Sequence, residues 1–443
     1  MQDFYKVWRV NCEKQTLSIE AVPESWRHLG GRALTARILL DEVPPLCHPL
    51  GPNNKLVFAP GLLVGHMLSS CDRISVGGKS PLTGGVKESN AGGSTGLIMA
   101  ALGTKALILE GAPSDKGLSV LHITSEQTSF EPSGELAGAG VYETARQLRE
   151  RYGKKAAMAI IGPAGEWGLH AAGIQNLDKD GVPSRIAARG GLGAVMGKKG
   201  LKAIVFEIDG RERPPIANPQ AFKAAQKEFT RALMEHPQTV TYRDYGTAAM
   251  AHLSDGFGGL PTRNFSAGIF EQVDDISGDT LREMLLERGG PSNPTHACMA
   301  GCTIRCSNIV GSADGETIVA PLEYETIGLL GSNLGIGDLD EIARMNYEVN
   351  DLGMDTIEVG GALGVAAEAG LMAFGDFQAA MGLSPAPAPA AWPLSTPSAT
   401  WTRSARPSGS WPFALPALDA KAVRGQQLEL RLCSVFLPDV RGI

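Results

Sequence analysis

The pattern of apolar residues in this 443-residue chain changes near residue 209, and this change constrains the fold more than any other feature. Before it, short alternating or continuous apolar runs typical of strands are mixed with a few helical segments and glycine-rich connections. After it, the spacing is mainly that of helices. We therefore predict an α+β chain with a β-sheet-rich domain at 1–208 and a helical domain at 209–377.

Individual elements follow from the same patterns. A hairpin is predicted at 5–22, with its turn at 11–14. Further strands are expected at 55–60, 73–76, 105–110, 156–161 and 202–208, and helices at 33–42, 94–102 and 141–152. In the second half, Asn218 and Pro219 predict the start of a helix whose apolar face is Phe222, Ala225, Phe229 and Leu233. More helices are expected at 279–288, 338–352 and 355–369.

Composition excludes several classes of protein. Apolar residues make up 43% and charged residues 20%, as in globular proteins, and the net charge of −7 argues against a basic nucleic-acid surface. No apolar run approaches the roughly 18 residues of a membrane span, and the N-terminus has no signal-peptide core. Seven cysteines, an odd and small number, form no disulfide scaffold. We therefore expect a cytoplasmic protein that binds neither nucleic acid nor membrane.

Three of the seven cysteines, Cys298, Cys302 and Cys306, lie within nine residues. Such thiolates could hold zinc, with His296 as the fourth ligand, or a [4Fe–4S] cluster. Iron–sulfur is favoured, because soft thiolates at short spacing suit it and no second pair of zinc ligands is evident.

Glycine is abundant, with 55 residues, and two stretches combine it with nearby basic side chains. Residues 89–96 and 191–197, with Arg185 and Arg189 upstream of the second, would let backbone N–H groups approach an anion. Neither a P-loop nor a Rossmann fingerprint fits, because the glycine spacing is wrong and no strand is predicted before residue 191. Together the two stretches indicate a large phosphorylated cofactor, although each alone could be a tight turn.

Two polar segments are further candidates. Glu323 and Glu325 follow the cysteines closely and could supply a general acid or base, or simply begin a helix. Residues 350–355 break two helices and could either cap them or hydrogen-bond a polar heterocycle.

Several segments together resemble the tungsten-containing aldehyde:ferredoxin oxidoreductase family, over about residues 4–375. They occur in the family's order: 30–34, 54–61, 79–84, 89–93, 161–166, 188–197, the cysteine cluster, 322–326, 330–333 and 350–355. The resemblance implies an N-terminal sheet domain that forms a base for a pterin cofactor, followed by mostly helical domains. It also implies an enzyme that oxidises an aldehyde to a carboxylic acid and passes electrons to ferredoxin.

The cofactors implied by this resemblance are tungsten, or molybdenum, held by two pterins, a magnesium ion that bridges the pterin phosphates, and a [4Fe–4S] cluster. Cys298, Cys302 and Cys306 would be cluster ligands, and Glu323 the glutamate of the metal pocket. Arg73 would lie between pterin and cluster, and Asn90 and the backbone at Ile186 would face the magnesium. The pterin would contact Gly92, Gly93, Arg185, Ala188, Asn350, Met354 and Asp355.

This chain departs from the family in its cysteine spacing and in its tail. The family uses C-x2-C-x3-C, whereas the first gap here has three residues. The family also places a fourth cysteine, a second pterin loop and a histidine in its last domain. The family's Glu-x-x-His iron site between subunits is absent, so we predict no such iron, and a homodimer is one option among others.

The tail at 378–443 contains no acidic residue between Asp376 and Asp419, and it concentrates proline and tryptophan. We predict that it is an atypical Pro/Ala/Trp-rich tail from a disrupted reading frame, with the last helical domain largely missing. Apolar faces at 338–369 would then be exposed and this chain inactive. The alternatives are a same-scaffold enzyme that acts on another carbonyl or an aromatic thioester, and a non-catalytic cofactor-binding fragment.

Overall fold

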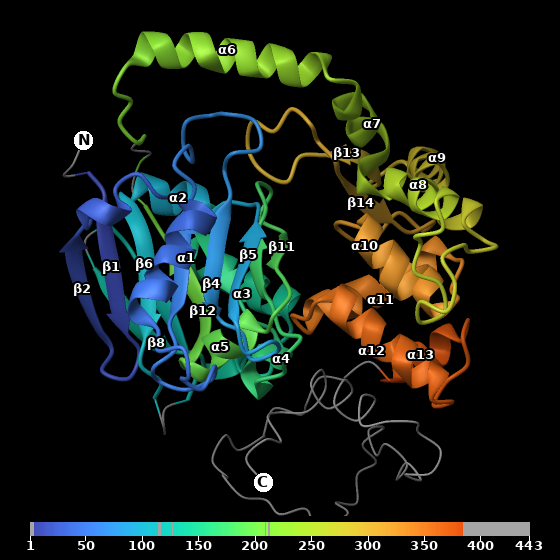
Figure 1. The fold of residues 1–443 in the computed structure, drawn as a ribbon, viewed down its shortest axis with the longest axis horizontal. Coiled ribbons are helices and arrows are strands. Elements are labelled where there is room, and N and C mark those ends of the chain that lie inside the picture. The colour runs from blue at the N-terminus through green and yellow to red at the C-terminus, as the bar shows by residue number, and fades with distance from the viewer. Residues whose placement is uncertain (1–3, 114–116, 126, 209, 211–212, 384–443) are drawn as a thin grey trace, which may run out of the picture.

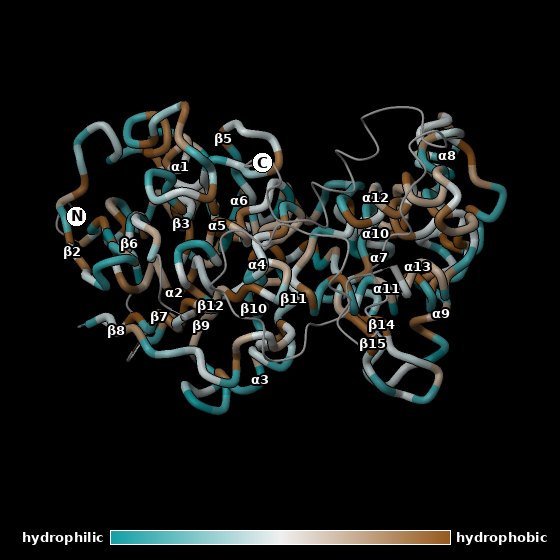
Figure 2. Tube along the Cα trace, turned by 90° about the horizontal axis from the view of Figure 1, so that it is seen from below, coloured by the Kyte–Doolittle hydropathy of each residue, from teal (hydrophilic) through white to brown (hydrophobic). Residues whose placement is uncertain are grey.

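The computed structural model describes residues 4–113, 117–125, 127–208, 210 and 213–383. In these residues, a domain of two six-stranded sheets is followed by a mainly helical region, which confirms the predicted α+β class. Figure 1 shows the sheets and the helices as two lobes, and Figure 2 shows from below that hydrophobic segments gather inside both. None of the described helices is long and apolar enough to cross a membrane.

The first sheet has the strand order β2-β1-β6-β3-β4-β5. Its strands are β1 (Lys6–Asn11), β2 (Thr16–Ala21), β3 (Leu56–Pro60), β4 (Ile74–Lys79), β5 (Val86–Ala91) and β6 (Thr104–Glu110). β1 and β2 form the predicted antiparallel hairpin, and β1 runs parallel to β6. Helices of this half are η1 (Glu24–Trp26), α1 (Gly31–Glu42) and α2 (Thr95–Ala101).

The second sheet has the order β11-β10-β9-β12-β7-β8. Its strands are β7 (Ser119–Ile123), β8 (Thr128–Pro132), β9 (Ala157–Ile160), β10 (Ile174–Leu177), β11 (Pro183–Ala187) and β12 (Leu201–Phe206). Its helices are η2 (Gly134–Leu136), α3 (Val141–Tyr152), α4 (Pro163–Trp167) and α5 (Leu192–Lys198). Sequence patterns missed β10 and β11, so the statement that no strand precedes the glycine stretch at 191–197 is wrong.

The two sheets pack face to face, with α1 and α3 on the outer faces. Along β3, Val57 and Ala59 join the core under α1, while Leu56 and Phe58 join the core between the sheets. All four are fully buried, because successive side chains of a strand point to opposite faces. A strand covered on both faces therefore shows a continuous apolar run, the pattern that predicted β3.

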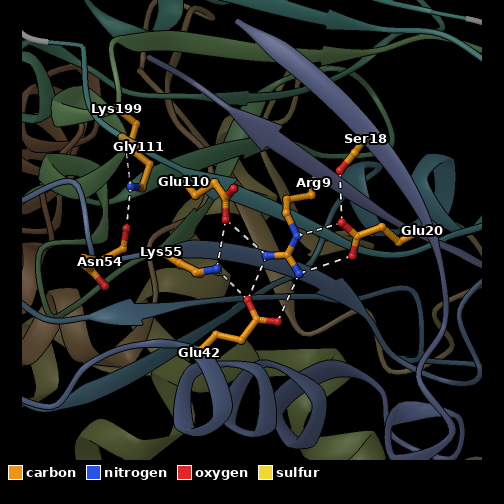
Figure 3. A network of polar contacts seen from close by, with 9 residues as sticks. All are labelled: Arg9, Ser18, Glu20, Glu42, Asn54, Lys55, Glu110, Gly111 and Lys199. Atoms are coloured by element: carbon orange, nitrogen blue, oxygen red, sulfur yellow. Dashed lines mark hydrogen bonds and ion pairs between the residues drawn. The ribbon is translucent and has the colours of Figure 1, made fainter. Parts of the chain in front are cut away.

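A network of charged side chains joins α1 to one end of the first sheet (Figure 3). Arg9 Nη1 lies 2.8 Å from Glu42 Oε2 and 3.2 Å from Glu110 Oε2. Lys55 Nζ donates to the same two carboxylates, at 2.6 and 2.9 Å. Burial alone would raise the pKa of Glu42, but the hydrogen bonds from Arg9 and Lys55 bring that pKa below its usual value. The positive charges of Arg9 and Lys55 thus compensate the negative charges of Glu42 and Glu110 at this end of the sheet.

The second half contains more than helices. Its helices are α6 (Pro219–Glu235), α7 (Pro237–Tyr245), η3 (Gly246–Ala249), α8 (Met250–Gly256), η4 (Asp274–Ile276), α9 (Gly278–Arg288), α10 (Tyr324–Thr326), the π-helix η5 (Ile327–Gly331), η6 (Ser332–Leu334), α11 (Leu339–Asp351), α12 (Thr356–Glu368) and α13 (Phe377–Leu383). An unpredicted sheet of three short strands lies among them: β13 (Asn293–His296), β14 (Ser307–Gly311) and β15 (Thr317–Val319).

The core of the helical region is closed around α11 and α12. We expected apolar faces at 338–369 to be exposed, and this expectation is wrong. Ile342, Val349, Val359 and Leu363 are at most 2% exposed and belong to one cluster with residues of α9, β14 and η5. The predicted tail at 378–443 lies outside the described residues from 384 onward, and its first residues form part of α13.

Helix α6 begins as predicted but does not pack as predicted. The Asn218 side chain accepts a hydrogen bond from Ala221 N, and Pro219 occupies the first turn. No residue of α6 is buried, however, and Figure 1 shows the helix running along one end of the molecule. The face predicted from Phe222 and Phe229 therefore makes limited contact in the described structure, including a ring contact of Phe222 with His66.

Candidate active site at the junction of the two regions

The predicted cluster ligands lie in the loop between β13 and β14. Cys302 is buried, and Cys298 and Cys306 are half-buried. Burial, together with the smaller effects of Glu323 and the other two cysteines, raises the pKa of Cys306 to about 12. Burial also raises the pKa of Cys298, against the opposing charge of Arg185. Three thiols in such surroundings become thiolates when a bound metal compensates their charge, which fits a metal cluster.

A second group of possible metal ligands includes His296, which lies just before the cysteine loop. Among the described residues, one set of three possible ligand atoms lies within 4.8 Å of one another, and it consists of Asp178, Asp180 and His296. His296 Nε2 lies 3.3 Å from Asp178 Oδ2. His296, the alternative zinc ligand considered from the sequence, thus pairs with an aspartate in the described structure.

Arg73, Asn90 and Gly92 lie next to the cysteine loop. The Arg73 guanidinium donates to the side-chain oxygen of Asn90. It also donates to the backbone carbonyl oxygen of Asn90, at 3.4 Å. A Cβ atom added to Gly92 would lie 3.4 Å from Cys298 Sγ and 3.8 Å from Arg73 Nη1. The glycine loop after β5 and the first cysteine thus adjoin, with Arg73 beside both.

Gly93 is required by the backbone at this point. Its φ is +102°, and an added Cβ would lie 2.3 Å from the carbonyl oxygen of Leu177 at the end of β10. Strands β5 and β11 are also in contact, so Asn90 and Ile186 come from neighbouring strands. The Ser89 hydroxyl donates to the carbonyl oxygen of Ala188, which fixes the second glycine-rich loop against the first.

Arg185 and Glu323 meet in the same region. Arg185 is 9% exposed, its Nη2 donates to Ser307 Oγ at 2.7 Å, and its Nε has no hydrogen-bond partner. Its Nη1 lies 3.9 Å from Glu323 Oε1. Thr247 donates to the other Glu323 oxygen. Burial raises the pKa of Glu323, and the charge of Arg185 and the hydroxyl of Thr247 only partly oppose this.

The loop at 350–355 packs on the N-terminal domain. Gly173 N donates to Gly353 O at 2.9 Å, and Asp355 N donates to Ala171 O at 3.0 Å. Asp355 is 2% exposed, and burial raises its pKa to about 6, although Arg189 Nε lies 3.5 Å from Oδ2. This Oδ2 has no hydrogen-bond partner in the described structure.

The structure therefore brings most of the predicted residues to one junction. The cysteines adjoin Arg73, Gly92, Arg185 and Glu323, and Asp355 and the fully buried Met354 lie beside the loops at 171–173 and 188–191. Asn350 differs from Asp355 because both of its side-chain groups are hydrogen-bonded within the protein. Its amide donates to Asn346 at 2.9 Å, and its oxygen accepts from Gln175 at 3.3 Å.

Sequence reasoning missed several polar residues at this junction. Thr247 and Ser307 contact Glu323 or Arg185, and Gln175 and Asn176 each carry a buried side-chain oxygen without a partner. No motif marks them, because single Thr, Ser, Gln and Asn residues are common everywhere. A pterin, with ring N–H groups and a phosphate, fits the unpaired oxygens of Asp355 and Gln175 and the unpaired N–H of Arg185.

The described fold thus places the cysteine loop and these polar groups where a sheet domain meets a mainly helical region. Family models agree with this description over most of the chain. Residues 7–208 match the N-terminal domain of aldehyde ferredoxin oxidoreductase, and residues 224–378 match domains 2 and 3 of the same family. The chain belongs to the aldehyde ferredoxin oxidoreductase family.

Individual relatives support this assignment. The chain is 36% identical over 365 residues to a tungsten-containing aldehyde ferredoxin oxidoreductase of Thermococcus kodakarensis, covering 81% of this chain and 57% of the relative. It is 29% identical to an aliphatic sulfonate oxidoreductase, WOR-like subunit, of Pyrococcus furiosus, covering 76% and 54%. The chain thus spans about half the length of the curated relatives it matches.

A solved structure shares the fold. It is the active-site complex BamBC of benzoyl coenzyme A reductase with 1,5-dienoyl-CoA, at a TM-score of 0.69 and 23% identity. The match covers 84% of this chain and 56% of that chain. At 23% identity, this similarity shows a shared fold.

Proposed function

We propose that this chain carries the pterin base and cluster loop of an oxidoreductase that converts an aldehyde to a carboxylic acid. Its cofactors would be tungsten, or molybdenum, held by two pterins, a bridging magnesium and a [4Fe–4S] cluster, with ferredoxin as the electron acceptor. The observation that carries the proposal is the meeting of Cys298, Gly92 and Arg73 at one point, with Arg185 and Glu323 beside them.

When bound, the metal and the cluster supply two-electron oxidation and one-electron transfer, respectively. The residues of this chain hold and orient these groups. Cys298, Cys302 and Cys306 would bind iron, and the glycine loop would let backbone approach a pterin between β5 and the cysteines. Arg73 lies where it can donate to both groups, and Arg185 and Asp355 offer the polar atoms that are unpaired in the described structure.

Glu323 is the best candidate for proton transfer. Its side chain is 26% exposed, so a small substrate can reach it, and burial raises its pKa, which makes the carboxylate a stronger base. Because oxidation of an aldehyde with water releases protons, a carboxylate at this place can accept one and pass it to solvent. Thr247 and Arg185 would hold the carboxylate in place during that exchange.

The decisive experiment is metal analysis of the full chain purified anaerobically, together with aldehyde-dependent reduction of a dye. We expect tungsten or molybdenum, about four iron and pterin per chain. Such loading together with dye reduction would overturn the prediction from the sequence that the disrupted tail leaves this chain inactive. Zinc without iron would contradict the proposal. Activity on a sulfonate or an aromatic thioester, but not on aldehydes, would support the same fold and cofactors with another substrate.

A homodimer and a cytoplasmic location stay predictions from sequence.

A cysteine variant tests the cluster loop directly. Cys302→Ser should abolish the iron–sulfur absorbance and the reduction of ferredoxin, because a serine oxygen is a poor replacement for a soft thiolate. Cys47→Ser is the matched control, since Cys47 is a free, half-buried cysteine in another part of the chain. Equal iron content in both variants would exclude Cys302 as a ligand.

A further inference from the structure

The loop between β3 and β4, residues 61–73, lies against the cysteine loop through its serines. Ser70 Oγ lies 3.6 Å from Cys302 Sγ, within hydrogen-bond range for sulfur. Ser69 Oγ accepts from Thr303 N at 3.0 Å, and Thr303 Oγ1 donates to it at 2.9 Å. The two serine hydroxyls are themselves 3.3 Å apart. Neither serine belongs to a motif recognised in the sequence.

These contacts form a chain of hydrogen bonds with one direction. A backbone N–H can only donate, so Thr303 fixes Ser69 Oγ as an acceptor. The Ser69 hydrogen is then available for Ser70 Oγ, and the Ser70 hydrogen for the sulfur. A metal-bound Cys302 is a thiolate and can only accept. The direction therefore runs from Thr303 through Ser69 and Ser70 to Cys302, and aligned bonds of this kind strengthen one another.

The backbone of the loop is arranged to present Ser70. Ser70 has φ +63°, a left-handed conformation that non-glycine residues seldom adopt. The buried Asp72 side chain accepts from Gly65 N at 2.8 Å, which closes the loop on itself. Ser69 and Cys302 are 3% and 7% exposed, and Ser70 is half-buried between them and the surface. Such strain at a contact with a functional residue is typical of a role beyond packing.

We propose that Ser70 is a positioning residue for the iron–sulfur cluster, acting through Cys302 by donating a hydrogen bond to its sulfur. This inference rests on the proposed function. The reduced cluster carries one more negative charge, part of which lies on the ligand sulfurs. A donor aimed at Cys302 Sγ therefore stabilises the reduced cluster more than the oxidised one, and raises its reduction potential.

The test is a redox titration of the anaerobically reconstituted full chain, followed by electron paramagnetic resonance. Ser70→Ala should lower the reduced-to-oxidised ratio at the wild-type midpoint about three- to tenfold, where tenfold is about 59 mV for one electron. Alanine has no hydroxyl but tolerates positive φ as poorly as serine, so the backbone strain is matched. Thr303→Val is the control, because it removes a nearby hydroxyl while keeping the N–H that orients Ser69. Its midpoint should shift much less than that of Ser70→Ala.

Two further readouts separate this role from packing. In D2O, the Fe–S stretching bands assigned to cysteine should shift in the wild type and not in Ser70→Ala. If Ser70→Ala loses the cluster, Ser69→Ala should give a smaller shift in the same direction. Equal midpoints in the wild type and the Ser69 and Ser70 variants, or an equal shift in Thr303→Val, would overturn the inference and leave the proposed function standing. A wild-type chain without any [4Fe–4S] signal would overturn both.

Discussion

Carboxylates at the outer end of the first sheet and at the junction experience opposite surroundings. Glu42 and Glu110 share Arg9 and Lys55, and these partners lower the pKa of both carboxylates despite burial. At the junction, burial raises the pKa of Glu323 and of Asp355, and the nearby arginines compensate only in part. The first arrangement stabilises the fold at neutral pH. The second costs stability in the chain alone, which is expected where a ligand completes the bonding.

The largest expected effect is on turnover. Glu323→Gln keeps the size of the side chain and an acceptor for Thr247, but removes the titrating group. We expect aldehyde oxidation to fall about 10²- to 10⁴-fold, the usual contribution of general acid–base catalysis. The limb of the pH–rate profile that belongs to Glu323 should also disappear. Glu42→Gln is the matched control and should leave turnover unchanged. Equal rates in the two variants would remove Glu323 from the mechanism.

The second effect is on stability and has an unusual sign. The folded pKa of Asp355, about 6, lies above its unfolded value of 3.8, so its ionisation destabilises the native chain as pH rises from about 4 to 6. Asp355→Asn should therefore raise the unfolding free energy of the cofactor-free chain by about 1–3 kcal/mol at pH 7.5. The gain should vanish below pH 4. Denaturant unfolding at both pH values measures it.

The same Asp355 variant should hold pterin less well, because its side chain would no longer offer a charged acceptor to ring N–H groups. If Asp355 serves a ligand at the expense of stability, its variant should be more stable and contain less pterin. A loss of stability at pH 7.5 would instead indicate that the Arg189 ion pair outweighs the cost of burial.

The smallest effect belongs to the outer network. Glu42→Gln should lower the unfolding free energy by about 1–2 kcal/mol at pH 7, because three charge-assisted hydrogen bonds lose their charged acceptor. The folded pKa of Glu42 is below its unfolded value, so the difference should persist above pH 5 and disappear as pH falls through the folded pKa. Glu24→Gln, at an exposed pair with Arg27, should change stability by less than about 0.5 kcal/mol.

Much of the fold was accessible from sequence because its signals are local. The hairpin, β3, α3 and the cap at Asn218 each follow from periodicity or from a residue with a strong local preference. Five strands of the first domain were missed, namely β5, β7, β8, β10 and β11. In β5, β10 and β11, polar residues interrupt the apolar pattern. The three-stranded sheet of the helical region was also missed, because each of its strands is only three to five residues long.

The sequence by itself determined the residue types of the site: three cysteines at short spacing, two glycine-rich loops and a glutamate after the cysteines. It also determined where glycine is needed, since Gly93 has φ +102° and no space for a side chain. Only the tertiary structure decided which polar groups meet them. Ser70 lies 232 positions from Cys302, and Thr247 lies 76 positions from Glu323. Contacts between such distant residues leave no local pattern, because they depend on how segments far apart in the chain pack together.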